Sequence, residues 1–366
     1  MHYYDETQEV LYKHLMETKV IFERLLYEKF GDGCVKIITS FDLGFPHDVI
    51  RLAGGFATGA YVYWESNKPI VPVDTCVNDC AVTFFEINKD IRYMFSKEYL
   101  SEFELRMKET IYQLNFHRGN HFMLFVQSLM TGKMYLVLHS SANEFKDNYN
   151  GLYPTETNYV HECIKIYRSN GRYIRYVDEN AAELFCRISL QLPAFNEARH
   201  EFIASTFLNH NATILNATTS HHYCMPTCNS VTMGGHVSKS GMIFPFLTIP
   251  GENIFTIKYL STKDIDLNLP YDGEFLTPHG LGKQDTIRPQ IEIDIKHNIC
   301  RLGGFTYNIK WGESLRSHAT LKLRDFERDR VFNFLKLIYD YEITDEFVQL
   351  ASYNKSGSII WNTDSL

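Results

Sequence analysis

The stretch Arg118–Asn143, RGNHFMLFVQSLMTGKMYLVLHSSAN, contains two apolar runs with a short polar segment between them. The runs Phe122–Val126 and Met134–Leu138 are apolar, aromatic and β-branched, and a Thr-Gly pair between them is typical of a turn. The pattern predicts a β-hairpin. A symmetric register would place His121 opposite His139, with Cβ atoms roughly 5 Å apart, close enough for both imidazoles to bind one metal ion. Two ordinary strand-end histidines that meet solvent would give the same pattern.

Further elements are predicted on both sides of this hairpin, and together they indicate an α+β protein. Helical spacing of apolar residues predicts helices over Asp5–Phe30, from a capping box at Ser101 and Glu104, over Pro193–Asn209 and over Glu327–Tyr339. Strands are predicted over Cys34–Ile38, Ala60–Trp64, Ala81–Ile87, Tyr159–Tyr167, Arg172–Val177, Met242–Leu247, Ile254–Leu260, Gln290–Lys296 and Thr306–Trp311. In the helix that begins at Pro193, the residues expected to face inward are Phe195, Ala198 and Phe202.

Composition excludes several classes of protein. The hydrophobic share of 45% indicates a globular chain, and no apolar run reaches the roughly 20 residues of a membrane span. The first residues lack the basic and apolar parts of a secretion signal, so we expect a cytoplasmic protein without membrane contact. A net charge of −8 argues against a surface that binds nucleic acid everywhere, but it allows a local basic groove.

The cysteines form two pairs with C-x3-C spacing. Cys76 and Cys80 form the first pair, and Cys224 and Cys228 form the second. In a reducing compartment, eight cysteines over 366 residues are expected to be free thiols or metal ligands rather than a disulfide framework. A structural zinc site is a rival interpretation of these pairs.

A second predicted hairpin is basic. An Asn-Gly turn separates Tyr159–Tyr167 from Arg172–Val177, and the basic residues on it are Lys165, Arg168, Arg172 and Arg175. A groove for RNA phosphates and an exposed sheet edge defended by charge both explain such a pattern.

Short histidine motifs follow one another along the chain. They are Gly119-Asn120-His121-Phe122, His139-Ser140-Ser141, His221-His222 and His279-Gly280-Leu281-Gly282-Lys283. In this order they resemble the G-N-H-F, H-S-G-S-R, H-N and H-G-A-G-R motifs of the RtcB family of RNA ligases, enzymes of tRNA splicing and RNA repair. Ile249-Pro250-Gly251 is similar to the I-P-G turn of that family, and Cys80-Ala81-Val82 is similar to its C-G-V.

The resemblance runs from about Gly54 to Lys283, and the chain departs from the family within it. Val77 stands where the family has an aspartate three residues before the cysteine, and a one-residue gap brings Asn78 or Asp79 there. Asn143 and Lys283 replace two arginines of the motifs. His47, near the position of a P-D-x-H motif, is interpreted as an ordinary loop histidine. The chain resembles a divergent member.

The resemblance implies an RtcB-like α+β fold, with mixed and antiparallel sheets and flanking helices around a metal-centred active site. It implies a single domain over 1–366, with an N-terminal helix in 1–33, the motif-bearing core in 54–283 and C-terminal strands and helices in 284–366. The implied activity is a GTP-dependent ligase with two Mn2+ ions. It would join an RNA 2′,3′-cyclic phosphate or 3′-phosphate end to a 5′-hydroxyl end.

The same resemblance implies roles for individual residues. His279 would attack the α-phosphorus of GTP and carry GMP as a phosphoramidate, a role that neutral imidazole can fill. The metal ligands would be Asp79, Cys80, His121, His139 and His221, a set of thiolate and imidazole groups that suits Mn2+ or Zn2+. Residues that would contact the nucleotide are Asn120, His222, Pro250, Gly251, Gly280, Gly282 and Lys283.

Two other functions stay open at this point. The C-x3-C pairs and the lost arginines also fit a catalytically inactive, zinc-stabilised RNA-binding protein. The same ligands could serve a metal-dependent phosphoesterase that has no histidine nucleophile. Consumption of GTP separates the three hypotheses.

Overall fold

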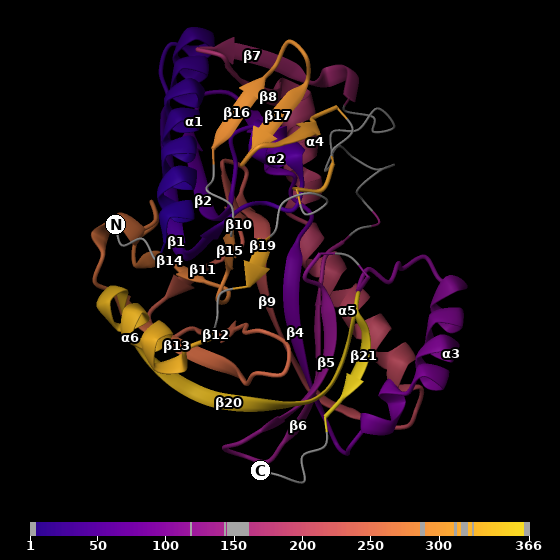
Figure 1. Ribbon diagram of the computed structural model, residues 1–366. Coiled ribbons are helices and arrows are strands. Elements are labelled where there is room, and N and C mark those ends of the chain that lie inside the picture. Colours follow the sequence, from indigo (N-terminus) through magenta and orange to yellow (C-terminus); the bar gives the residue numbers. More distant parts are fainter. Residues whose placement is uncertain are drawn as a thin grey trace.

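A mixed α+β fold with mostly antiparallel sheets is seen in the computed structural model of the protein (Figure 1). The structure describes residues 5–117, 119–142, 144, 161–285, 290–310, 313–315, 321–323 and 326–361. Within these residues, no helix is long and apolar enough to cross a membrane. The α+β prediction is confirmed.

The largest sheet in this part of the chain has 11 strands, and neighbouring strands in it run antiparallel. In spatial order its strands are β1 (Cys34–Gly44), β2 (Thr58–Glu65), β10 (Ser230–Met233), β9 (Ile214–Thr227), β4 (Cys80–Ile87), β6 (Met134–Ser140), β5 (Phe122–Ser128), β20 (Tyr339–Asn354), β13 (Ile254–Thr262) and β12 (Ile243–Phe246), with β21 (Gly357–Ile360) paired to β20. Segments from both halves of the sequence therefore alternate in its centre.

Smaller sheets surround this one. They are β11 (Gly235–Lys239) with β14 (Glu274–Pro278), β15 (Lys283–Asp285) with β19 (Leu321–Leu323), β16 (Ile291–Asp294) with β17 (Ile299–Leu302) and β18 (Phe305–Asn308), and β3 (Ile70–Pro72) with β8 (Arg172–Asp178) and β7 (Lys165–Ser169). The helices are α1 (Glu6–Phe30), α2 (Val49–Ala53), α3 (Lys97–Lys108), α4 (Glu179–Ser189), α5 (Leu192–Leu208) and α6 (Arg328–Ile338).

Helix α1 has the boundaries that its sequence predicts. The Asp5 side chain accepts a hydrogen bond from the Gln8 N–H at 3.0 Å, and Gly31 ends the helix with a φ of 88°, which favours glycine. Leu11, Leu15, Phe22 and Leu25 are buried on the face that packs on β1. Figure 1 shows α1 along one side of the molecule.

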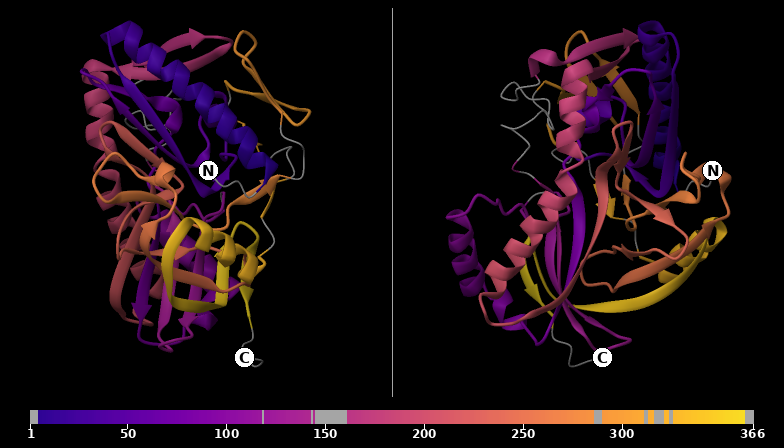
Figure 2. Two further views of the ribbon diagram at one scale, coloured as in Figure 1. Left: turned by 90° about the vertical axis from the view of Figure 1, so that its left-hand side faces the viewer. Right: turned by 180° about the vertical axis from the view of Figure 1, so that it is seen from behind.

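Helices α4 and α5 follow each other along the opposite side (Figure 2, right). Helix α5 packs on β4, β6 and β9, the central strands of the large sheet. Its inward face differs from the expected one. Asn196, Arg199 and His200 are fully buried, whereas Phe202 is 38% exposed, because the sheet presents polar backbone and hydroxyl groups there.

The hairpin of β5 and β6 forms as predicted, but its register is one residue from the expected one. Phe122, not His121, pairs with His139. The reason is the turn. The Ser128 N–H donates to the Lys133 carbonyl at 2.9 Å, so the loop consists of the four residues between them, and the strand register is symmetric about the middle of that loop. His121 precedes the strand.

The start of α3 also differs from the prediction. Ser96 caps the helix by accepting a hydrogen bond from the Tyr99 N–H at 3.4 Å. Ser101 lies inside the helix, where its hydroxyl donates to the Lys97 carbonyl at 2.9 Å. The helix therefore begins one turn before the expected capping box.

The basic hairpin is β7 and β8, and its charges bind acidic partners within the protein. Arg175 forms two hydrogen bonds to the buried Asp74, with Nε 2.9 and 3.1 Å from the carboxylate oxygens. Lys165 pairs with Asp178 at 2.8 Å, and Arg172 pairs with Glu17. Arg172 and Arg175 therefore hold the small sheet to its neighbours, and Lys165 links its own two strands, which neither earlier interpretation anticipated.

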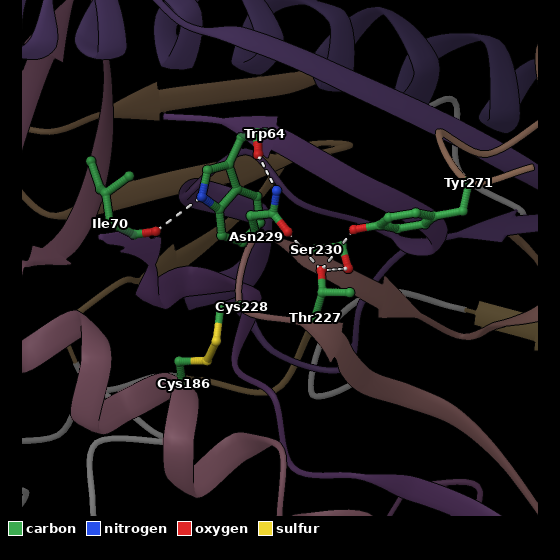
Figure 3. Close-up of a disulfide and its surroundings, with 8 residues drawn as sticks. All are labelled: Trp64, Ile70, Cys186, Thr227, Cys228, Asn229, Ser230 and Tyr271. Atoms are coloured by element: carbon green, nitrogen blue, oxygen red, sulfur yellow. Dashed lines mark hydrogen bonds between the residues drawn. A yellow bond between two sulfur atoms is a disulfide. The ribbon is translucent and has the colours of Figure 1, made fainter. Parts of the chain in front are cut away.

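A disulfide joins Cys186 of α4 to Cys228 in the turn between β9 and β10 (Figure 3). The expectation of free thiols is wrong for these two residues, whereas Cys76, Cys80 and Cys224 are buried and free. Near the disulfide, the Trp64 indole of β2 donates to the Ile70 carbonyl of β3 at 3.0 Å (Figure 3).

Candidate functional site

A thiol and three imidazoles meet where β4, β5, β6 and β9 lie side by side. Cys80 begins β4, and His139 pairs with Val82 on the neighbouring β6, so both side chains project from one face. The Cys80 Sγ lies 3.2 Å from His139 Nε2 and 3.6 Å from His121 Nε2. His139 Nε2 lies 3.2 Å from His222 Nε2. Ligand atoms of Cys80, His139 and His222 fall within 4.8 Å of one another, which suits one metal ion.

His222, rather than His221, enters this group because of a bulge in β9. Cys80 pairs with Tyr223 and Ala81 pairs with His221, so His222 is the extra residue between the two pairs. A bulge redirects the side chain of its extra residue, and here it turns the His222 ring toward Cys80. The structure thus brings His222, expected at the nucleotide, together with Cys80 and His139, whereas His221, expected at the metal, is not in that group.

His221 instead lies between two carboxylates. Its Nδ1 is 3.0 Å from the Asp79 carboxylate, and its Nε2 is 2.9 Å from that of Glu197. Burial opposes protonation of this ring, but the hydrogen bond and charge of Asp79, with those of Glu197, raise the pKa of His221 to about 9. The Asp79 carboxylate is thus paired with His221. Neither residue belongs to the set of ligand atoms that lie within 4.8 Å of one another.

The two hairpin histidines are oriented by backbone carbonyls. His121 Nδ1 lies 3.2 Å from the Asn115 carbonyl, and His139 Nδ1 lies 3.1 Å from the Asn120 carbonyl. A carbonyl can only accept, so each Nδ1 carries the hydrogen and each Nε2 offers its lone pair toward Cys80. Metal-binding histidines in proteins are oriented by such contacts.

Burial decides the protonation of the group. It lowers the pKa of His139 and of His222 well below the ordinary histidine value, so both rings are neutral. Burial also raises the pKa of the Cys80 thiol, which a metal ion would offset by binding the thiolate. Thiolate and neutral imidazole are ligands of transition-metal ions, so these residues fit a metal of that class.

His279 lies against the same group from another direction. It follows β14, and its ring stacks on that of His222 with centroids 4.8 Å apart and planes at 19°. Its Nδ1 and its backbone N–H both donate to the Asp42 carboxylate of β1, the latter at 3.0 Å. With Nδ1 occupied, Nε2 is the nitrogen left to react.

Gly280 lets the chain pass close to the neighbouring segment. A Cβ at Gly280 would lie 2.5 Å from the Leu247 carbonyl oxygen, so no larger residue fits without a shift. Leu247 N–H donates to the His279 carbonyl, and Leu281 N–H donates to the Leu247 carbonyl, both at 3.0 Å. These contacts fix the backbone on both sides of His279.

A cavity of about 450 Å3 opens beside these histidines. Its wall includes Cys80, His121, His222 and His279, and from the residues expected to contact the nucleotide it includes Asn120, Pro250, Gly280 and Gly282. Gly251 is not among the residues of the wall, and its N–H donates to Gln349 at 3.2 Å. The backbone of Lys283 belongs to β15, whereas the side chain of Lys283 and all of Asn143 lie outside the described residues.

Some residues of the site were not expected. Asp42, His47 and Arg51 also form the cavity wall, although His47 was interpreted as an ordinary loop residue. The polar face of α5 supports the group from behind, where Asn196 donates to the Asp79 carbonyl at 2.8 Å and Arg199 donates to the Ser140 hydroxyl at 2.8 Å. Two features of the sequence could have indicated these residues. Asp42 lies inside an apolar strand, and Asn196 and Arg199 are polar residues at helical spacing.

No protein-family model matches this chain, and no curated protein matches it.

Proposed function

We propose that the protein is a GTP-dependent RNA ligase that seals a 3′-phosphate or 2′,3′-cyclic phosphate end to a 5′-hydroxyl end. The proposal combines the order of the histidine motifs with the geometry around His279. The observation that carries it is the chain of contacts Asp42–His279–His222, which sets a reactive nitrogen beside a candidate metal group in the wall of a cavity.

His279 is the proposed nucleophile. Because Asp42 accepts the Nδ1 hydrogen, the Nε2 lone pair is available without loss of a proton. Nε2 would attack the α-phosphorus of GTP, pyrophosphate would leave, and GMP would be held through a P–N bond. The RNA 3′-phosphate would then take the GMP, and the 5′-hydroxyl would displace it to form the phosphodiester.

The metal group fits this chemistry. Cys80, His139 and His222 would hold one Mn2+ ion, and Cys80 and His121 are the described side chains placed to share a second. Bound metal ions would neutralise phosphate charge during the transfer. Because the Asp79 carboxylate is paired with His221, this second site would have less negative charge than the sequence suggested.

The cavity supports a nucleotide-sized substrate. Its volume of about 450 Å3 lies within the range of small-molecule sites, and its wall combines apolar residues with many polar and charged ones. The backbone at Gly282 lines the cavity beside the proposed nucleophile and carries no side chain, which would allow phosphate to approach closely.

A mass spectrum of the intact protein after incubation with GTP and Mn2+ tests the proposal. The wild type should gain the mass of one GMP, which acid should release, and His279→Ala should gain nothing. His297→Ala is the matched control, because His297 contacts Asp294 on the surface as His279 contacts Asp42 inside. It should gain GMP normally. A wild type that takes up no GMP with any divalent metal would remove the ligase proposal.

A further inference from the structure

His222 differs from the other two histidines of the metal group in how its second nitrogen is placed. His121 and His139 each donate Nδ1–H to a backbone carbonyl, whereas the Nδ1 of His222 is buried and has no hydrogen-bond partner among the residues that the structure describes. His222 is 2% exposed, so water from the surface does not replace that partner. A buried N–H that lacks an acceptor is unfavourable.

A second buried nitrogen without a partner belongs to His236, which lies next to His222. The two ring centroids are 5.7 Å apart, and the rings are edge to face. His236 is fully buried, and within the described part of the chain its Nε2 has no hydrogen-bond partner. Its Nδ1 lies 3.1 Å from the His221 carbonyl, which can only accept, so Nδ1 carries the hydrogen and Nε2 is an acceptor.

The two nitrogens are complementary once a metal is bound. In the metal-free protein His222 can carry its hydrogen on Nε2 and donate to His139 Nε2, 3.2 Å away, which leaves Nδ1 as a bare acceptor. A metal ion at Nε2 requires that lone pair, so the hydrogen must move to Nδ1. The Nδ1–H of His222 then needs an acceptor, and the neighbouring ring of His236 offers its Nε2.

We propose that His236 is a positioning residue for the metal centre, which accepts a hydrogen bond from His222 Nδ1–H, directly or through one water, and so fixes His222 in its metal-binding tautomer. The inference rests on the proposed metal centre and deepens it. The partners of metal-bound histidines are ordinarily carboxylates, carbonyls or water, and here an imidazole would fill that place. The tautomer of His236 is set in turn by the backbone carbonyl of His221, which accepts its Nδ1–H.

The environment of His236 offers a matched pair of variants. Its ring stacks on Phe244 with centroids 4.4 Å apart and planes at 17°. His236→Phe keeps a flat ring for this contact but removes the acceptor. His236→Gln retains an oxygen that can accept near the position of Nε2. The two variants therefore separate packing from hydrogen bonding.

Co2+ titration of the full-length chain, followed by the thiolate-to-cobalt absorption band, gives the affinity without any need for ligase activity. His236→Phe should bind Co2+ about 10- to 100-fold more weakly than the wild type. His236→Gln should recover most of that loss. The free energy of unfolding without metal should fall alike in the two variants, because both lose the hydrogen bond to the His221 carbonyl, so the difference in Co2+ affinity between them reports the acceptor alone.

Nitrogen-15 NMR of histidine-labelled wild type loaded with Zn2+ gives a second test, which no folding defect of a variant can affect. It should show Nδ1–H on His222 and a bare, hydrogen-bonded Nε2 on His236. Wild-type Co2+ affinity in His236→Phe, or a bare Nδ1 on metal-loaded His222, overturns the inference and leaves the metal centre standing. A wild type that binds neither Co2+ nor Zn2+ overturns the metal centre and the inference together.

Discussion

The Asp42 carboxylate accepts two hydrogen bonds from one residue, from the backbone N–H and from the ring Nδ1–H of His279. Two bonds to one carboxylate fix both the position of the chain and the orientation of the ring. Asp42 is 1% exposed, so water does not compete for its oxygens. Asp42, on a strand remote in sequence, thus determines that Nε2 is the reactive nitrogen of His279.

Replacement of that carboxylate should therefore stop the first chemical step. In Asp42→Asn the side-chain amide can donate to Nδ1, which moves the ring hydrogen to Nε2 and removes the nucleophilic lone pair. GMP transfer to the protein in a single turnover should slow by about 10²- to 10⁴-fold, as in enzymes whose catalytic histidine loses its carboxylate. Asp294→Asn, at the surface His297 contact, should react at the wild-type rate. A normal rate in Asp42→Asn would contradict the role given to this carboxylate.

The bulge in β9 gives opposite predictions for two adjacent histidines. His222→Ala should lose bound metal, because it removes a member of the Cys80 group. His221→Ala should retain metal, because its ring contacts Asp79 and Glu197 instead. Metal content after dialysis, measured by mass spectrometry of the element, decides between them. Loss of metal in His221→Ala alone would return this histidine to the ligand set.

The basic hairpin should matter for stability. Arg175→Met leaves the Asp74 carboxylate, which is fully buried, without its cation, and should lower the free energy of unfolding by about 3 kcal/mol. The exposed Arg168 on the same hairpin is the matched control, and Arg168→Met should change this free energy by less than about 0.5 kcal/mol. Urea unfolding measures both. Equal stability of the two variants would mean that the buried pair contributes nothing net.

Acid should destabilise the protein through His14. This buried ring accepts from Arg172 at 2.6 Å and contacts the Leu52 carbonyl at 2.8 Å; burial and then Arg172 lower its pKa to about 3. The unfolded chain takes up this proton near pH 6.5 and the folded chain only near pH 3, so stability falls as pH drops between these values. The slope from one such group approaches about 1.4 kcal/mol per pH unit.

His14→Gln removes this titration and should flatten the pH dependence of stability between pH 6.5 and 4, although the variant is less stable at neutral pH. Urea unfolding at several pH values measures the slope for both proteins. Parallel pH profiles for the variant and the wild type would show that His14 titrates normally.

Elements with strong local signals could be predicted from the sequence. Helix α1 has a capping aspartate, a helical repeat and a terminal glycine, and α5 has Pro193 in its first turn. Strands β9 and β20 could not be predicted, because the first half of each is largely polar, and their order comes from pairing with remote strands. Long-range pairing leaves no periodic mark on such segments.

The candidate site shows the same division. The motif histidines could be selected from the sequence by the order of their motifs, and His121, His139 and His279 also lie near a strand end or a glycine. The exchange of His221 and His222 depends on one bulge, and the hairpin register depends on the length of one turn. Asp42 and His236 reach the site only through the packing of β1 and β11. No local pattern records contacts of that kind.

Strand β20 has a consequence for how the chain acquires its structure during synthesis. Residues 347–354 of β20 pair with β5, the strand that follows His121, while its first half pairs with β13. Until the ribosome has made these late residues, β5 has an open edge with unpaired backbone groups, and its apolar side chains lack part of their cover. Contacts so distant in sequence also slow folding. The hairpin that carries the candidate metal ligands is therefore among the last parts of the large sheet to gain both neighbouring strands. In a nascent chain stalled before Tyr339, the unpaired edge of β5 would be exposed to chaperones or to other copies.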